Sequence, residues 1–389
     1  MRLGDIATVI TKGTTPTSLG FDFVPKGINF IKIESIAEDG SFIPSKFGHI
    51  DSKCNNALKR SQLEENDILF SIAGAIGRTA IVTKDILPAN TNQALAIIRM
   101  PEGFFDYSYL LYVLQSPNLI KQIEKKKQGV AQLNISLKDI SDFVVPDISI
   151  EEQKKIASNL SKVGELISCR KEQLAKLDEL VKARFVEMFG DPVCNEKGWN
   201  TKPLLEMGSC KNGMNFHYDD AGVDINCLGV GDFKDYSIIS DTSVLPTVSL
   251  NETPSDDYML KDEDIVFVRS NGNKTLVGRS VAIYPGKVPT TFSGFCIRYR
   301  KTDETVNISY LLRVLKTESI RKKMAGRGAN IQNLNQQILG TLIIPIPPLN
   351  LQNQFAAFVE QTEKTKAEVQ KSLDELEILK KSLMQKYFG

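Results

Sequence analysis

Cysteine, histidine and tryptophan are scarce in this chain. Its 389 residues include 6 cysteines, 2 histidines and 1 tryptophan. The cysteines form no Cys-x-x-Cys pair, and His49 and His217 are the only imidazoles that could complete a metal site. Because structural zinc needs four such ligands, the sequence argues against a metal site.

The chain also lacks an excess of one charge and any long apolar run. Lys and Arg number 48 against 47 Asp and Glu, which leaves a net charge of +1. The total charge therefore does not indicate a polyanionic partner such as DNA, and any basic surface must be a local patch. No apolar run approaches the ~20 residues that cross a bilayer, and no basic-then-apolar leader follows Met1. We therefore expect a cytoplasmic, reduced protein.

Motifs of common enzymes are missing as well. There is no Gly-x-x-x-x-Gly-Lys-Ser/Thr loop, no Gly-x-Gly-x-x-Gly after a strand, and no Asn-Pro-Pro-aromatic tetrapeptide. Asp147, Glu152 and Lys154 superficially match a nuclease pattern, but their spacing is too tight for two strands to present both carboxylates to one metal. A strand end followed by a helix cap explains them better, and we predict no catalytic residue.

What the chain does contain is a long internal repeat. Tyr109–Leu114 returns as Tyr310–Leu315, Gly77-Arg78 as Gly278-Arg279, and Phe189-Gly190 as Phe388-Gly389. A duplication of this length, with each copy ending in a helix, predicts a pseudo-two-fold molecule that presents two related but unequal surfaces.

Each copy divides into an α+β domain and a long helix. The expected domains are residues 1–148 and 191–347, of which 191–203 form a linker. The expected helices are 149–190 and 348–389. Runs rich in β-branched residues predict strands at 28–33, 67–72, 94–99, 264–268 and 295–299. One helix is predicted late in each domain, over 107–127 and 309–325.

Apolar residues at heptad spacing run along both long helices, so each helix needs a partner. In the first copy they are Leu160, Val163, Ile167, Leu174, Leu177 and Val181, and in the second Val359, Val369, Leu373, Leu376 and Leu383. The second domain follows the end of the first helix and precedes the second. If the two helices pair, they must therefore be antiparallel. They would then form a spacer between two globular domains, and Gly389 would return to the neighbourhood of Met1. The alternative is that each helix folds onto its own domain.

Two segments in each domain carry residue types suited to DNA. A basic cluster runs into a glycine-containing polar stretch late in the domain, and a loop of diverged sequence precedes Gly77 and Gly278. The basic clusters can equally be solvated C-terminal ends of helices, where cations complement the helix dipole. The loops can equally be surface loops whose sequences have diverged without a functional reason. The candidate DNA-binding residues are Lys12, Lys32, Arg78, Lys125, Lys126, Lys127, Gln132, Arg269, Asn271, Asn273, Lys274, Arg279, Lys322, Lys323, Arg327 and Gln332.

Several short stretches, present twice and in the same order, resemble the specificity subunit of type I restriction-modification systems. They include Gln132-Leu133-Asn134, Phe143–Pro146 and Glu152–Ala157, with counterparts around Gln332, Pro345 and Gln352. The resemblance implies two target-recognition domains, each reading one half of an asymmetric split DNA site, with the helices as a spacer. It also implies two modification subunits that carry S-adenosylmethionine and restriction subunits that use ATP and Mg²⁺. No cofactor is expected in this chain.

Two other classes of function stay open at this point. The domains could form a self-sufficient nuclease or methyltransferase, or the chain could be a coiled-coil protein adaptor. Methylation or cleavage of DNA without partners would favour the enzyme, and absence of a bipartite footprint would favour the adaptor.

Overall fold

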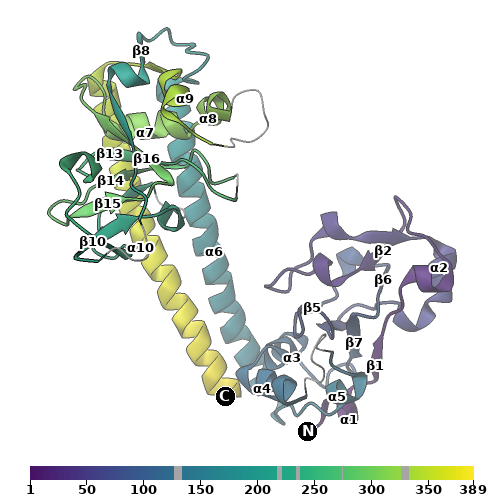
Figure 1. The fold of residues 1–389 in the computed structure, drawn as a ribbon. Coiled ribbons are helices and arrows are strands. Elements are labelled where there is room, and N and C mark those ends of the chain that lie inside the picture. The colour runs from purple at the N-terminus through teal and green to yellow at the C-terminus, as the bar shows by residue number, and fades with distance from the viewer. Residues whose placement is uncertain (127–133, 217–220, 234–236, 274, 326–332) are drawn as a thin grey trace. The chain divides into compact units, whose positions relative to one another are not determined.

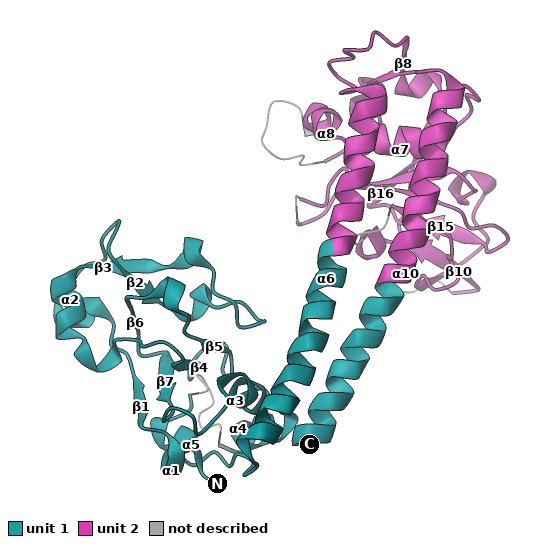
Figure 2. Ribbon diagram, turned by 180° about the vertical axis from the view of Figure 1, so that it is seen from behind, with its two compact units in different colours: residues 1–172, 370–389 teal, residues 173–369 magenta. Residues whose placement is uncertain are grey.

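The computed structural model describes residues 1–126, 134–216, 221–233, 237–273, 275–325 and 333–389. These residues form two compact units, coloured separately in Figure 2. Unit 1 comprises Met1–Glu172 and Gln370–Gly389, and unit 2 comprises Gln173–Val369. Both units combine helices with small sheets, which confirms the α+β class. None of the helices in the described part of the chain is long and apolar enough to cross a membrane.

Unit 1 contains two sheets (Figure 1). The first has the order β1-β7-β4-β5, with every neighbouring pair antiparallel. Its strands are β1 (Val9–Lys12), β7 (Leu95–Arg99), β4 (Ile68–Ser71) and β5 (Thr79–Ile81). The second has the order β3-β2-β6, in which β2 is antiparallel to β3 and parallel to β6. Its strands are β3 (Gly48–Ile50), β2 (Ile28–Ile31) and β6 (Ala89–Thr91).

Unit 2 repeats this topology. Its larger sheet has the order β11-β14-β13-β16-β9, formed by β11 (Ile238–Ile239), β14 (Ser280–Ile283), β13 (Asp264–Val268), β16 (Cys296–Lys301) and β9 (Gly208–Asn212). A second sheet has the order β12-β10-β15, formed by β12 (Thr247–Leu250), β10 (Val223–Leu228) and β15 (Thr290–Phe292). As in unit 1, its central strand is antiparallel to one neighbour and parallel to the other. A further pair joins β17 (Ile343–Pro345) to β8 (Thr201–Pro203). The internal repeat is therefore present in the fold as well as in the sequence.

The same buried ion pair fastens the larger sheet of each unit. The Arg99 guanidinium donates from Nε and Nη2 to the two carboxylate oxygens of Asp67, both at 2.7 Å. Arg300 makes the same contacts with Asp264 at 2.8 and 2.7 Å. Each carboxylate also accepts a backbone N–H three residues earlier, so its charge is well compensated. Hydrogen bonding to the aspartate raises the pKa of both arginines.

The late helix of each domain is broken in two, so the prediction of one continuous helix was wrong. Unit 1 has α3 (Tyr107–Leu114) and α4 (Pro117–Lys126), and unit 2 has α7 (Ile308–Lys316) and α8 (Glu318–Ala325). Pro117 lacks an N–H and disfavours helical geometry in the residue before it. In unit 2, Thr317 is extended (φ −64°, ψ 147°) and its hydroxyl donates to the Val314 carbonyl, which ends α7.

Four short helices complete the domains. They are α1 (Leu3–Ile6), α2 (Ser52–Ala57), α5 (Leu137–Ser141) and α9 (Gln336–Gly340). The first strand predicted from the sequence, 28–33, ends at Ile31 because residues Ile33–Ser35 form a 3-10 turn, η2.

A buried glutamine fastens the first turn of each long helix to its own domain. The helices are α6 (Ile150–Phe189) and α10 (Leu349–Phe388), each of 40 residues. Gln153 accepts from the Asp106 N–H at 3.0 Å and donates to the Ile148 carbonyl. Gln352 accepts from the Asn307 N–H at 2.8 Å and donates to the Pro347 and Thr305 carbonyls. Both side chains are almost fully buried.

The two long helices are antiparallel in each unit. In unit 1 the first half of α6 meets the end of α10, through Asn159 with Tyr387 and Lys171 with Glu377. In unit 2 the second half of α6 meets the start of α10. There the Phe185 and Phe355 ring centroids lie 5.5 Å apart, and Lys366 Nζ lies 2.8 Å from Asp178 Oδ1. Each unit thus takes part of both helices, so the alternative of a helix folded only onto its own domain is wrong.

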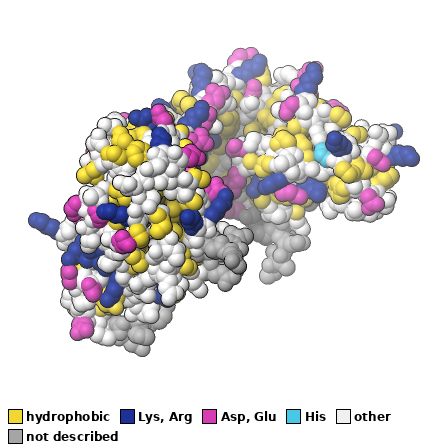
Figure 3. Space-filling model, turned by 90° about the horizontal axis from the view of Figure 1, so that it is seen from above, with side chains coloured by type: hydrophobic (Ala, Val, Ile, Leu, Met, Phe, Trp, Pro, Cys, Tyr) yellow, Lys and Arg dark blue, Asp and Glu magenta, His cyan; other side chains and the backbone are white. Residues whose placement is uncertain are grey.

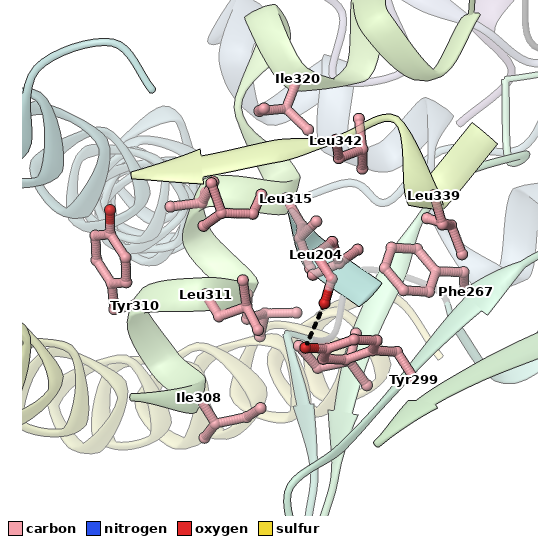
Figure 4. Packing of buried hydrophobic residues seen from close by; sticks show 14 of the residues in the cluster. Leu204, Phe267, Tyr299, Ile308, Tyr310, Leu311, Leu315, Ile320, Leu339 and Leu342 are labelled. Atoms are coloured by element: carbon pink, nitrogen blue, oxygen red, sulfur yellow. Dashed lines mark hydrogen bonds between the residues drawn. The ribbon is translucent and has the colours of Figure 1, made fainter. Parts of the chain in front are cut away.

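Each long helix ends in the core of the unit opposite to the one in which it begins. Phe189 of α6 packs on Tyr310 of α7, with centroids 4.8 Å apart. Phe388 of α10 packs on Tyr109 of α3 at 5.5 Å, in the cluster that also holds Leu3. The C-terminal residues therefore lie against the N-terminal segment of unit 1, as expected. Figure 4 shows the unit 2 core, where the Tyr299 hydroxyl donates to the Leu204 carbonyl.

The eleven apolar residues assigned to helix pairing are all at least half-buried. Fully buried are Leu160, Val163, Val369 and Leu373, and the others are partly covered. The pattern left out Phe185 and Phe189, which are among the most buried side chains of α6.

Replacing Gln352 with Met should destabilise unit 2 by about 2–4 kcal/mol. The buried Pro347 carbonyl and the partly buried Asn307 N–H and Thr305 carbonyl would lose their partner. A buried polar group left without a partner costs about 1–3 kcal/mol. Urea unfolding of the full chain measures the change. Gln354→Met, at an exposed position of the same helix, should stay within about 0.5 kcal/mol of the original. Equal midpoints for both variants would contradict this role.

Candidate nucleic-acid interface

One end of the larger sheet in unit 1 gathers several segments that the sequence singled out. Lys12, the last residue of β1, pairs with Ala96, and Ser71, the last of β4, pairs with Leu95. The end of β1, the end of β4 and the start of β7 therefore lie together. The Lys12 side chain is exposed there.

The polar stretch that follows α4 returns to this end of the sheet. Asn134 forms a β-bridge with Ala73, and the Ile135 N–H donates to the Ile72 carbonyl at 3.0 Å. The loop before Gly77-Arg78 and the last residues of the polar stretch, far apart in sequence, are thus side by side. We call this set of segments, around residues 12, 72–78 and 134, the unit 1 sheet end.

Arg78 acts mainly within the protein. Its guanidinium Nη1 lies 2.8 Å from the Ile36 carbonyl oxygen and 3.4 Å from that of Ile33, and so holds η2 against the loop. Lys32, just before η2, is half-buried, with Nζ 4.6 Å from the Phe23 ring centroid. Both cations lie near the sheet end, but the contacts of Arg78 are those of a positioning residue.

Unit 2 builds its own sheet end in the same way. Arg269 follows β13, and its N–H donates to the Phe295 carbonyl at 2.7 Å. The Leu334 N–H, from the second polar stretch, donates to the Arg269 carbonyl at 2.8 Å. These bonds reproduce the contacts of Ile72 with Ala94 and with Ile135. The unit 2 sheet end therefore comprises the segments around residues 269–278, 293–295 and 333–334.

The loop between β13 and β14 is shaped by its own asparagines. Asn271 Oδ1 accepts the Asn273 N–H at 2.7 Å, and Asn273 Oδ1 accepts the Thr275 N–H at 3.1 Å. Because these turns use the amide oxygens, the amide nitrogens are the donors that the two side chains can offer to a ligand. Arg269 Nη1 lies 3.3 Å from the Gly294 carbonyl, and Arg279 is half-buried two residues beyond Val277.

The basic clusters divide into exposed and structural cations. Lys125 at the end of α4, and Lys322 and Lys323 in α8, are exposed, and Lys322 forms an ion pair with Glu318 at 2.6 Å. Arg321 instead donates to the Val277 carbonyl at 3.1 Å, and burial lowers its pKa. The α8 cluster is thereby tied to the loop before Gly278.

Part of the predicted set lies outside the described residues. These are Lys127, Gln132, Lys274, Arg327 and Gln332. Lys126 ends α4, and its side chain is outside the description as well.

Phe295 is a candidate that the sequence reasoning missed. It was assigned to a strand, but β16 begins at Cys296 and Phe295 stands beside Arg269 with 61% of its surface exposed. Its counterpart in unit 1 is Ala94. Gly294 precedes Phe295, and a Cβ added to this glycine would lie only 2.1 Å from Asn215 Oδ1. The backbone next to the exposed ring is therefore closely packed. Exposed aromatic rings of this kind can stack on or wedge between bases.

Figure 3 shows how the charges are distributed on one face. Lys and Arg side chains are interspersed with Asp and Glu among the residues drawn in colour. This mixture agrees with the near-zero net charge and suits contacts made at local sites.

Comparison with known families decides what these two units are. The family model for the type I restriction modification DNA specificity domain matches residues 1–179 and again residues 196–377. The chain belongs to this family. Each match covers most of one repeat, so the specificity domain is present twice. Family membership confirms the resemblance seen in the sequence motifs and makes the chain a DNA specificity subunit.

Individual relatives agree. Over 174 residues the chain is 31% identical to the EcoBI specificity subunit of Escherichia coli, a match that covers 43% of this chain and 36% of that protein. It is 24% identical over 404 residues to the MjaVIII specificity subunit of Methanocaldococcus jannaschii, covering 99% and 90% of the two chains.

Solved structures share the fold. A chain from a study of complex assembly and conformational transition of the type I R-M system has a TM-score of 0.63 at 16% identity, covering 100% of this chain and 96% of that one. The S subunit from M. genitalium has a TM-score of 0.55 at 15% identity, with 100% and 95% covered.

Arg78 and Lys125 should respond differently to removal. Arg78→Ala should destabilise unit 1 by about 1–2 kcal/mol, because two backbone carbonyls lose a charged donor. Lys125→Ala should leave stability within about 0.5 kcal/mol but reduce the salt dependence of DNA binding by about one unit per lost phosphate contact. Urea unfolding and binding titrations at several salt concentrations measure both effects. An unchanged salt slope for Lys125→Ala would make that lysine a solvated helix end.

Proposed function

We propose that the two domains of this specificity subunit read the two halves of one asymmetric, bipartite DNA site. The observation that carries the proposal is that the specificity domain occurs twice with the same strand order but different loops at the sheet ends. Similar scaffolds with unlike loops present unlike surfaces, so two different half-sites are expected in place of a palindrome.

Each sheet end is the proposed contact surface. In unit 1 it offers Lys12, to which we add Lys32 before η2 and Lys125 of α4. In unit 2 it offers Arg269, Asn271, Asn273 and the exposed ring of Phe295. Lys and Arg suit phosphates, and asparagine amides and arginine suit base edges in the major groove. Arg279, Lys322 and Lys323 belong to the same proposed surface, with the candidates that lie outside the described residues.

The paired helices are the proposed spacer. Because α6 and α10 are antiparallel and each is fixed at both ends by buried contacts, their length sets the distance between the domains. A helix of 40 residues extends roughly 60 Å at 1.5 Å per residue. A stiff connection permits only one separation of the half-sites and raises the effective concentration of the second domain once the first has bound.

The helices also offer equivalent apolar positions for partner subunits. Leu180 of α6 and Leu379 of α10 occupy matching places in the repeat, and they are 49% and 44% exposed. Ile378, beside Leu379, is 69% exposed. Exposed apolar groups at two related places suit two copies of one partner. We propose that two modification subunits dock there, that they carry S-adenosylmethionine, and that restriction subunits contribute the ATP- and Mg²⁺-dependent steps.

A widened spacer should widen the recognised site. One heptad inserted after Glu172 in α6, together with one inserted before Gln370 in α10, adds about 10 Å, or about 3 base pairs at 3.4 Å each. The half-sites should be unchanged, because the domains are untouched. Footprinting of the reconstituted complex and sequencing of the methylated sites measure the gap.

A heptad inserted into α6 alone is the matched control, and it should lose binding because the helices no longer end in their cores. An unaltered gap in the double insertion would contradict the spacer. DNA methylation or cleavage by this chain alone would favour the self-sufficient enzyme, and the absence of a bipartite footprint would favour the adaptor.

Charges placed at the docking positions should remove partner subunits one at a time. Leu180→Glu or Leu379→Glu should reduce the complex from two modification subunits to one, and the double variant should bind neither, because a charge in an apolar interface is desolvated without a partner. Native mass spectrometry counts the subunits. Glu179→Gln, next to Leu180, is the control, and full assembly of the double variant would refute this docking site.

A further inference from the structure

Unit 2 contains a cavity, lined by both apolar and charged side chains, at the junction of its α+β domain with both long helices. Its volume is about 330 Å³, within the range of small-ligand sites. Helix α7 forms one wall, α6 and α10 form others, and the segment before β11 closes it. The charged side chains on its lining are Asp178, Lys182, Arg313, Lys316 and Glu363.

Arg313 enters this cavity without a hydrogen-bond acceptor among the described residues. Its Nε is buried and unpaired, and the guanidinium carbon lies 5.9 Å from the centroid of the Phe185 ring. Burial lowers its pKa. A buried N–H donor without an acceptor is unfavourable, so this Nε favours a ligand that carries acceptor oxygens.

Lys316, one turn further along α7, has a single hydrogen bond in the same setting. Its Nζ donates to the Ser237 hydroxyl at 2.9 Å, which is a neutral acceptor. Burial lowers the pKa of Lys316 to about 8, and the nearby Arg313 charge lowers it further. Two cations therefore face one cavity, and neither forms a hydrogen bond with the Asp178 or Glu363 carboxylates on the same lining.

The acidic residues on the lining are already engaged by another lysine. Lys366 of α10 lies 2.8 Å from Asp178 Oδ1 and 3.2 Å from Glu363 Oε1. This lysine, which is not on the cavity lining, offsets one of the two negative charges. Counting Lys182, Arg313, Lys316 and Lys366 against Asp178 and Glu363, positive charge exceeds negative charge around the cavity.

The corresponding place in unit 1 is neutral and satisfied. Tyr112 stands where unit 2 has Arg313, and its hydroxyl lies 3.2 Å from that of Ser161. Gln115 stands where unit 2 has Lys316, and it donates to Thr79 Oγ1 at 2.7 Å. Unit 1 therefore folds without cations at these two positions. The presence of Arg313 and Lys316 in unit 2 is explained by a function other than folding.

We propose that this cavity of unit 2 binds a small phosphate-type anion between Arg313 and Lys316, with Lys182 of α6 at its rim. The geometry suits a group with several acceptor oxygens, since a guanidinium and an ammonium offer donors from two directions. The source is either inorganic phosphate or a small phosphate ester, which share this chemistry. A bound anion would link α7 to α6 and so hold the domain more firmly on the spacer helix.

Binding is tested on the full chain by calorimetry and thermal unfolding at constant ionic strength. Inorganic phosphate and a nucleoside monophosphate are the two probes, with chloride as the reference salt. Saturating probe should raise the melting temperature of unit 2 by roughly 2–4 °C and slow amide exchange in Ile308–Lys316. A rise with the ester alone identifies the ester as the source, and a rise with both probes identifies the phosphate group itself.

Variants that copy unit 1 test the residues. Arg313→Tyr combined with Lys316→Gln should fold, because this pair is accommodated in unit 1, and it should weaken binding at least about tenfold. Lys316→Gln alone is the milder variant should the double variant unfold. Lys364→Gln, at an exposed position of α10 paired with Glu360, should bind as the original does.

Two results would overturn the assignment. One is no probe-dependent change in the original chain, including the case in which only duplex DNA stabilises it. The other is an equal change in the original and in Lys316→Gln, which would place the anion elsewhere.

Discussion

The structure depends on the way each long helix is held at both ends by different domains. Gln153 fastens the start of α6 to the first domain, while Phe189 buries its end against Tyr310 of the second. Gln352 and Phe388 do the same for α10 in the opposite direction. Each domain therefore completes its core with the end of a helix that begins in the other, and neither helix can shift along its axis without exposing an aromatic ring.

The sheet ends are held in place within each unit as well. Within each unit the polar stretch returns to the strand ends through the backbone bonds of Ile135 and Leu334, and the fixed ion pairs of Asp67 and Asp264 keep the sheets in register. Variable loops are thus carried on an invariant frame. The same frame carries the cavity at Arg313, where unit 2 has charged residues and unit 1 has neutral ones. The two copies thus differ in their loops and in the charge of this cavity, while the ion pairs of Asp67 and Asp264 are the same in both.

Much of this could be predicted from the sequence. The repeat, the α+β class, the antiparallel helices and the family all follow from motifs that recur in order and from heptad spacing. The single late helix was wrong because its apolar period continues through Pro117 and Thr317, where local capping prevails over periodicity. Arg78 was selected as a DNA contact by residue type, yet its position over the Ile33 and Ile36 carbonyls gives it a role inside the fold.

The sequence by itself determined the two long helices, the α+β class and that two domains share one plan, because these features depend on local spacing and on recurrence. Only the tertiary structure decided which side chains are available. Lys125 and Arg321 look alike in a basic cluster, but one is exposed and the other is bonded to Val277. Phe295 and Arg313 gained their significance from burial and from neighbours distant in sequence. Such differences arise from long-range packing, which residue type and spacing do not encode.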